Sequence, residues 1–144
     1  MLKDSTIVFL GGGAGCVLRY FVSLAAYRLA GPGFPWGTLA VNLAGCVSIG
    51  LIAGLASRHG APSQDGLPTP FAGLDHSVRL LLVTGLLGGF TTFSAFSIET
   101  VDLLRLAQPA RAATYVLASV LLGLTLAWVG WRLGMRPAPA GATP

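Results

Sequence analysis

The sequence has too few charged residues for a water-soluble domain of its length. Only 10% of its 144 residues are Asp, Glu, Lys or Arg, whereas 53% are hydrophobic. A typical soluble domain carries about 25% charged residues, which cover its surface. This composition excludes an ordinary soluble domain, and it predicts that most of the chain lies in lipid.

Acidic residues and clusters of basic residues are also scarce. The chain has five Asp and Glu against nine Lys and Arg, which gives a net charge of +4. The basic residues are scattered singly along the chain, so the charge does not indicate nucleic-acid binding. We predict no enzyme and no catalytic residue. The two cysteines, Cys16 and Cys46, lie inside apolar runs, which excludes a disulfide framework and favours a packing role for both.

Long apolar runs are what the sequence does have. A helix needs about 20 apolar residues to cross a bilayer. Four runs approach this length, and they predict an all-α integral membrane protein with a single transmembrane domain over residues 1–144. The predicted helices are residues 6–26, 37–56, 78–104 and 112–132.

The remaining segments are polar or rich in Pro and Gly. Residues 57–77 are predicted to form an exposed loop, in which His59 and His76 are solvated, and residues 137–144 a flexible tail. The nine basic residues divide weakly between the two membrane sides. With four crossings, Lys3, Arg58, Arg79, Arg132 and Arg136 fall on one side, Arg28, Arg105 and Arg111 on the other, and Arg19 within the first helix. So small a bias predicts dual topology.

Small residues recur at helical spacing in the first two apolar runs. Gly11 and Gly15 form one small-xxx-small pair, and Gly50 and Gly54 form another. Such pairs allow helix backbones to approach each other closely in lipid. The third run is different, because glycines and hydroxyl residues gather between Gly88 and Thr92 at mid-membrane depth. We predict a break in the helix there, where irregular backbone is tolerated only if it is buried in protein or lines a cavity.

Polar side chains within the first two apolar runs need a partner. Arg19 is costly in an apolar helix unless it faces a cavity or extends to the interface, and both interpretations are open. Thr38 and Asn42 are four residues apart and share a helix face. The amide of Asn42 can donate to an anion or bridge two helices.

The third and fourth runs carry a second group of candidate site residues. Phe93 and Phe96 share a face beside Ser94, and their ring edges carry partial positive charge that can face a small anion, although aromatic stripes more often serve packing. Tyr115 and Ser119 place two hydroxyls on one face of the last helix. Glu99 lies near the end of the third helix, where a carboxylate is expected at a vestibule.

Three motifs together resemble the bacterial fluoride channel family, Fluc or CrcB. They are Gly13-Ala-Gly-Cys-Val-Leu-Arg19-Tyr, Gly37-Thr-Leu-Ala-Val-Asn42-Leu-Ala-Gly45 and Gly88-Gly-Phe-Thr-Thr-Phe93-Ser-Ala-Phe96-Ser. The resemblance covers all four predicted helices, and the motifs occur in the family's order. It implies a fluoride-selective channel in the bacterial inner membrane, which lets fluoride leave the cytoplasm passively and so protects against fluoride toxicity.

The resemblance also implies an assembly and a set of site residues. Two subunits would insert antiparallel as a homodimer with two fluoride pores, and a structural Na⁺ would bind at the centre through the carbonyls of Gly88 and Thr91 of both subunits. The matching residues assign the pore to Thr38, Asn42, Phe93, Ser94, Phe96, Tyr115 and Ser119, and the vestibule to Arg19 and Glu99.

One position departs from the family pattern. The family usually reads Thr-Phe-Ser-Thr-Phe, whereas this chain has Ala95 between Ser94 and Phe96, so one hydroxyl of the conduction path is missing. The main alternative is a small dual-topology proton-coupled multidrug exporter. Such a transporter needs a carboxylate at mid-membrane, and the first, second and fourth predicted helices contain no Asp or Glu. A purely structural membrane protein is disfavoured by the cluster of Thr and Phe that follows Gly88.

Overall fold

The structure is a computed structural model that describes residues 1–58 and 70–135, and this part of the chain is helical. The elements are α1 (Leu2–Ala30), α2 (Trp36–Arg58), α3 (His76–Arg79), the π-helix η1 (Leu80–Leu87), α4 (Gly88–Phe90), α5 (Phe93–Arg105) and α6 (Pro109–Gly134). Most of the predicted loop, including His59, and the predicted tail with Arg136 lie outside the described residues.

Four helical spans in the described ranges are long and apolar enough to cross a membrane, as predicted. They run over Leu2–Ala30, Trp36–Arg58, His76–Arg105 and Pro109–Gly134, and each extends beyond the bounds expected from hydropathy. A helix continues past its apolar run until local chemistry ends it. After α1 the chain turns at Gly31 with φ 75°, and α6 begins with Pro109, which suits a first helical position.

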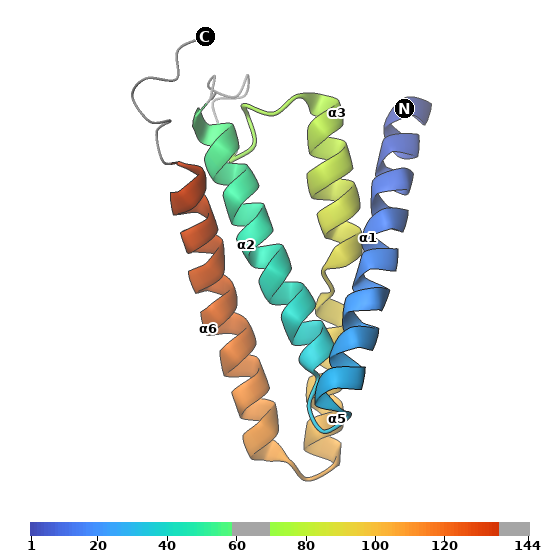
Figure 1. The fold of residues 1–144 in the computed structure, drawn as a ribbon, viewed down its shortest axis with the longest axis vertical. Coiled ribbons are helices and arrows are strands. Elements are labelled where there is room, and N and C mark those ends of the chain that lie inside the picture. The colour runs from blue at the N-terminus through green and yellow to red at the C-terminus, as the bar shows by residue number, and fades with distance from the viewer. Residues whose placement is uncertain (59–69, 136–144) are drawn as a thin grey trace.

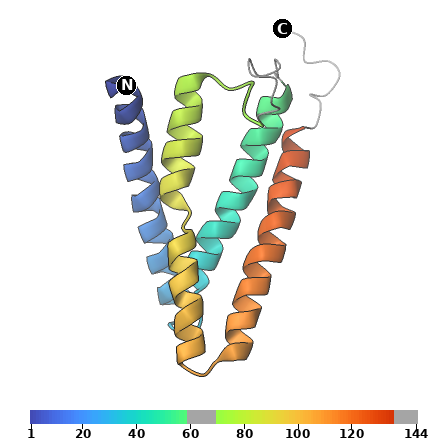
Figure 2. The same cartoon turned by 180° about the vertical axis from the view of Figure 1, so that it is seen from behind.

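The spans are arranged as two neighbouring pairs (Figure 1). α1 lies along η1 and α4, and α2 packs along α6, while α2 also contacts α1. The view from behind shows α5 next to the first half of α6, below the point where the third span changes direction (Figure 2). The first turn of α1 and the last turn of α6 lie at the same end of the bundle, as an even number of crossings requires.

Glycines allow both pairs to pack backbone against backbone. A Cβ added at Gly50 or Gly54 would collide with the carbonyl oxygens of Ala127 and Trp131 in α6. A Cβ at Gly11 would come within 2.5 Å of the Leu81 carbonyl oxygen, and one at Gly15 would collide with that of Leu86. The predicted close approach at both small-xxx-small pairs is therefore confirmed.

The third span begins earlier than predicted because Asp75 caps it. The Asp75 carboxylate accepts hydrogen bonds from the backbone N–H groups of Ser77 and Val78, and these bonds lower the pKa of that carboxyl. His76 is exposed, as predicted, but it belongs to α3 and not to a loop. The placement of His76 in a loop was therefore wrong. Its Nε2 lies 3.4 Å from an oxygen of Asp4 in α1.

Candidate functional site: two cavities beside an extended dipeptide

The site is built around two extended residues within the third span. Thr91 has φ −81° and ψ 158°, and Thr92 has φ −152° and ψ 115°. Helical geometry persists through Phe90, so the irregular backbone is shorter than the expected stretch from Gly88 to Thr92. η1 precedes it as a π-helix, which the sequence did not predict.

Asn42 of α2 holds this extended backbone. Its Nδ2 donates to the carbonyl oxygen of Thr92 at 3.0 Å, and its Oδ1 accepts from the Thr92 N–H at 2.9 Å. The side chain thus replaces both hydrogen bonds that Thr92 would make in a helix. A second Nδ2 hydrogen remains for another acceptor. Of the two roles considered for Asn42, bridging two helices is the one that these contacts show.

The same contacts change the pairing of two carbonyl groups. In a continuous helix the N–H of Thr92 would donate to Gly88, and the N–H of Ala95 would donate to Thr91. Here Thr92 donates to Asn42, and Ala95 donates to the hydroxyl of Thr92 at 3.2 Å, which caps α5. The carbonyls of Gly88 and Thr91 are therefore released from these two helical bonds.

Glu99 accepts hydrogen bonds from two other spans. The Thr38 hydroxyl donates to its Oε1 and the Tyr115 hydroxyl to its Oε2, each at 2.7 Å. Thr38 is 7% exposed and Tyr115 is fully buried, whereas Glu99 is only half-buried. The carboxylate therefore fixes two buried hydroxyl donors and stays accessible on one side.

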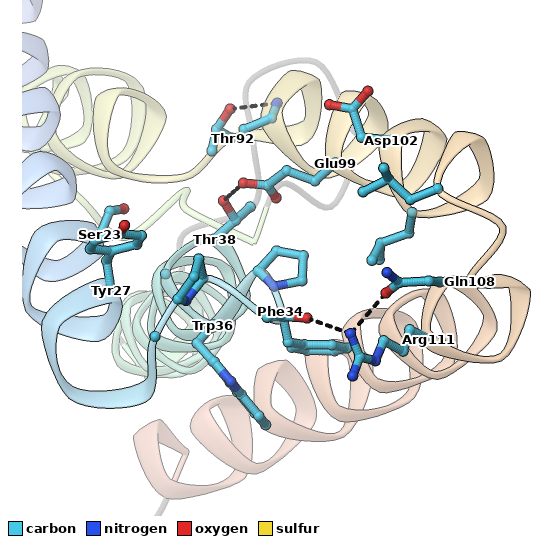
Figure 3. A pocket seen from close by; sticks show the side chains of 18 of the residues that line it. Ser23, Tyr27, Phe34, Trp36, Thr38, Thr92, Glu99, Asp102, Gln108 and Arg111 are labelled. Carbon is cyan, nitrogen blue, oxygen red and sulfur yellow. Dashed lines mark hydrogen bonds between the residues drawn. The ribbon is translucent and has the colours of Figure 1, made fainter.

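That accessible side is a cavity of about 600 Å³ at one end of the bundle (Figure 3). Its wall is formed by the end of α1, the α1–α2 connection, the start of α2 and of α6, and one side of α5. Both predicted vestibule residues, Arg19 and Glu99, line it, as do Thr38 and Thr92. Arg19 is half-buried, and its Nη2 lies 3.5 Å from the Cys16 sulfur.

A second cavity, of about 440 Å³, lies on the other side of Thr92. Thr92 lines both cavities, whereas Thr91 lines the second alone. Six of the predicted site residues line the second cavity: Asn42, Gly88, Thr91, Phe93, Phe96 and Ser119.

Three aromatic rings form a row next to this second cavity. The ring centroids of Phe93 and Phe96 are 5.6 Å apart, and those of Phe96 and Tyr115 are 5.2 Å apart. Phe96 is half-buried, but Phe93 is 79% exposed on this chain. The row leads from an exposed face of the chain to the buried Tyr115 beside Glu99.

The remaining predicted hydroxyls differ in their surroundings. The Ser119 Oγ is buried and has no hydrogen-bond partner within residues 1–58 and 70–135. Ser94 is exposed, and its Oγ lies 3.3 Å from the Thr92 Oγ1. Ser94 lines neither cavity, so the structure brings it near the break but not into the walls.

The sequence did not single out three residues of this site, which are Phe34, Thr92 and Arg111. Thr92 had a usable signal, because Thr is a favoured N-cap residue and a helix starts at Phe93. Phe34 packs on Tyr115, and Arg111 contacts the α1–α2 connection. Both contacts join residues about 80 positions apart in the chain, and no local pattern predicts them.

Side-chain metal ligands are not clustered in the described ranges. No three His, Cys, Asp or Glu residues come together within residues 1–58 and 70–135.

Residues 6–131 match the model of a known family, described as CrcB-like protein, Camphor Resistance (CrcB). The chain is 45% identical over 127 residues to the fluoride-specific ion channel FluC of Rhizobium etli. The aligned residues cover 88% of this chain and 92% of that protein. It is 42% identical over 123 residues to the protein of the same name from Phocaeicola vulgatus, with coverages of 85% and 91%. On the family match and these similarities, the chain belongs to the CrcB-like family of bacterial multi-pass membrane proteins.

Proposed function

We propose that this chain forms a fluoride-selective channel. The observation that carries the proposal is the pair of cavities that meet at Thr92, lined by hydroxyl groups, the Asn42 amide and aromatic edges. The similar proteins named fluoride-specific ion channels support the choice of ion. A channel conducts and does not transform its substrate, so no catalytic residue is assigned.

Fluoride accepts hydrogen bonds and donates none, so its path needs donors. Thr38 and Tyr115 supply two hydroxyls whose hydrogens point to Glu99. A fluoride ion that enters the first cavity can replace a Glu99 oxygen as the acceptor of the Thr38 hydroxyl, because both residues line that cavity and Glu99 is only half-buried. Tyr115 lines neither cavity, so its hydroxyl can serve the ion only where the carboxylate gives way. Arg19 in the cavity wall offsets the repulsion between the anion and that carboxylate.

Beyond Thr92 the path offers weaker partners. Within residues 1–58 and 70–135, one N–H of the Asn42 amide and the Ser119 hydroxyl have no partner, and the edges of Phe93 and Phe96 carry partial positive charge. Weak partners suit conduction, because an ion held too tightly does not leave. Ser94 lies outside both cavity walls on this chain, and we place it in the pore of the assembled dimer.

We also propose that the functional unit is an antiparallel homodimer. Phe93 is 79% exposed although it lines the second cavity, so a partner surface is needed to enclose the path. Basic residues occur at both ends of the bundle, with Lys3, Arg58, Arg79 and Arg132 at one end and Arg28, Arg105 and Arg111 at the other. This weak bias favours insertion in both orientations.

Dual topology predicts signal from both membrane sides. Reporters fused after the C-terminus, one active only in the cytoplasm and one only in the periplasm, should each give comparable signal in cells that express one gene. Adding three lysines after Gly134 should shift the signal toward one orientation. Signal from a single side in the unmodified protein would contradict the antiparallel dimer.

A sodium ion at the dimer centre is the third part of the proposal. The carbonyls of Gly88 and Thr91 lack the N–H groups that would close helical turns on them, and hard cations prefer oxygen ligands. Two subunits would supply four such oxygens. The ion would be coordinated by these carbonyl oxygens and would hold the two extended dipeptides together.

Fluoride efflux from liposomes tests the function. Purified protein should release fluoride down its gradient, as measured with a fluoride electrode, and should not release chloride. A potential of 100 mV should drive the anion with about 2.3 kcal/mol per charge. Equal chloride efflux would refute selectivity. Protein prepared in potassium without sodium should lose flux and regain it when sodium is added. Full flux without sodium would contradict the ion's role but leave the channel assignment intact.

A further inference from the structure

The connection between α1 and α2, residues 31–35, forms one wall of the first cavity. Gly31 to Pro35 all line it, next to Trp36 and Thr38 (Figure 3). The connection turns at Gly31 with φ 75°. Its backbone bonds are local, from the Gly31 N–H to Tyr27, from the Trp36 N–H to Phe34 and from the Leu39 N–H to Pro35. These bonds shape the turn but do not fix it to the other half of the bundle.

Arg111 of α6 makes the long-range tie. Its Nη1 donates to the Gly33 carbonyl oxygen at 3.2 Å and to the Gln108 Oε1 at 2.8 Å. Gln108 is the residue before α6, so it orients the guanidinium from the same helix end. Within residues 1–58 and 70–135, the bond to Gly33 is the only hydrogen bond that joins the connection to a span other than α1 and α2.

The connection carries Phe34 to the buried Tyr115. Their ring centroids are 5.5 Å apart at 79°, an edge-on contact, and Phe34 packs against the buried cluster that contains Tyr115 and Leu103. The other end of Tyr115 donates to Glu99. A continuous series of contacts therefore leads from Arg111 through Gly33 and Phe34 to the hydroxyl donor.

We propose that Arg111 is a positioning residue that holds the α1–α2 connection closed, so that Phe34 keeps the Tyr115 hydroxyl aimed at Glu99. The proposal rests on the proposed channel function. In this proposal, Arg111 acts on the first cavity indirectly, through the position of Tyr115. A cavity of about 600 Å³ is far larger than the roughly 30 Å³ of a water molecule. The cavity therefore has room for an ion together with several water molecules.

Electrostatic attraction of the anion explains the position of Arg111 less well than a tether does. The cavity wall holds Glu99 and Asp102 as well as Arg19 and Arg111, so its formal charges balance. A tether and an attracting charge also differ in their response to salt, since attraction between exposed charges weakens as ionic strength rises. Flux measured at two salt concentrations separates the two roles.

Arg111→Met keeps most of the side-chain length and removes the donors. Fluoride efflux per assembled dimer should fall about fivefold, the size of change that one lost hydrogen bond typically causes. The fall should be equal at low and high salt. Backbone hydrogen exchange at Gly31, Gly33 and Phe34, the residues of the connection that carry an N–H, should become faster. Arg111→Lys, which can still donate to Gly33, should restore most of the flux. Phe34→Leu should lower flux similarly, and the double variant should be no worse than either single one.

Arg28→Met is the matched control. Arg28 lies in the last turn of α1 at the same end of the bundle, is exposed, and makes no hydrogen bond or ion pair within the described ranges. It should leave flux and loop exchange unchanged. Wild-type flux in Arg111→Met, additive losses with Phe34→Leu, or a loss that disappears at high salt would each overturn the tether. If the unmodified protein conducts no fluoride, the channel assignment fails, and the exchange of residues 31–35 still decides whether Arg111 holds them.

Discussion

Replacing Phe96 with isoleucine should lower fluoride efflux by about tenfold or more and leave the proposed dimer assembled. Phe96 lines the second cavity, and its ring lies between Phe93 and Tyr115. A partly dehydrated fluoride passing Thr92 would lose the edge of this ring as a partner, and isoleucine offers no replacement. Each 1.4 kcal/mol added to the barrier slows passage about tenfold, so even a weak contact is measurable as flux.

The effect of Phe96→Ile on stability should be modest. Phe96 is half-buried, and isoleucine keeps an apolar side chain of moderate size. The loss of two ring contacts costs about 1–2 kcal/mol in free energy of unfolding. If Phe96 served packing alone, the variant would be less stable and would conduct at the wild-type rate per dimer. Normal flux together with normal elution as a dimer would show that the wrong aromatic residue has been assigned to the pore.

Phe93→Ile further separates a role of the ring in the pore from a role in packing. Phe93 is 79% exposed on one chain, so its replacement should barely change the stability of the subunit, while flux should fall as for Phe96. Phe21 of α1 is the control, because it is also exposed and contacts Tyr20 away from both cavities. Phe21→Ile should keep wild-type flux.

The four spans were predictable from the sequence because hydropathy over about 20 residues reports directly on lipid burial. Their ends were not, because helices continue into polar residues until a cap or turn intervenes, as at Gly31 and Pro109. The π-helix η1 also had no local signal. It lies where α1 meets the third span backbone to backbone, and a Cβ added at Gly11 would be 3.1 Å from the Gly85 Cα. We therefore attribute η1 to tertiary packing, which a one-dimensional pattern does not record.

The candidate site was predictable as a set of residue types and not as a set of contacts. A polar side chain in a lipid-embedded helix must find a partner, and this rule drew attention to Asn42. It did not say which partner. Asn42 pairs with the backbone of Thr92, fifty residues away, and Thr38 with Glu99, sixty-one residues away. Such pairings depend on how the spans cross.

These contacts explain how an extended dipeptide is stable within a span. Unpaired backbone groups are costly in a membrane, and the side chains of Asn42 and Thr92 satisfy two N–H groups and one carbonyl there. The carbonyls of Gly88 and Thr91 are released from two helical bonds, because the N–H groups of Thr92 and Ala95 donate to side chains. The residues that maintain the break are thus the same residues that line the proposed path, so structure and conduction depend on one set of hydrogen bonds.

Replacing Tyr115 with phenylalanine should lower fluoride efflux by about tenfold or more, because it removes one buried donor and nothing else. The ring contacts with Phe34 and Phe96 are retained, and the half-buried Glu99 lines the first cavity, so water can pair with the freed carboxylate oxygen. The cost in free energy of unfolding should be about 1 kcal/mol. Tyr20→Phe, which removes a hydroxyl from an exposed tyrosine of α1, is the control and should conduct normally.

Thr38 provides the complementary pair of variants. Thr38→Val removes the second donor to Glu99 with little change in shape, whereas Thr38→Ser keeps it. We expect Thr38→Val to lose flux as Tyr115→Phe does and Thr38→Ser to conduct near the wild-type rate, with efflux measured per assembled dimer. If the hydroxyls only stabilise the fold, Thr38→Val and Tyr115→Phe should lower the unfolding temperature and conduct normally. If both hydroxyls serve the ion, flux should fall in each variant while the folded dimer persists, because the anion then meets one donor where the wild-type channel presents two.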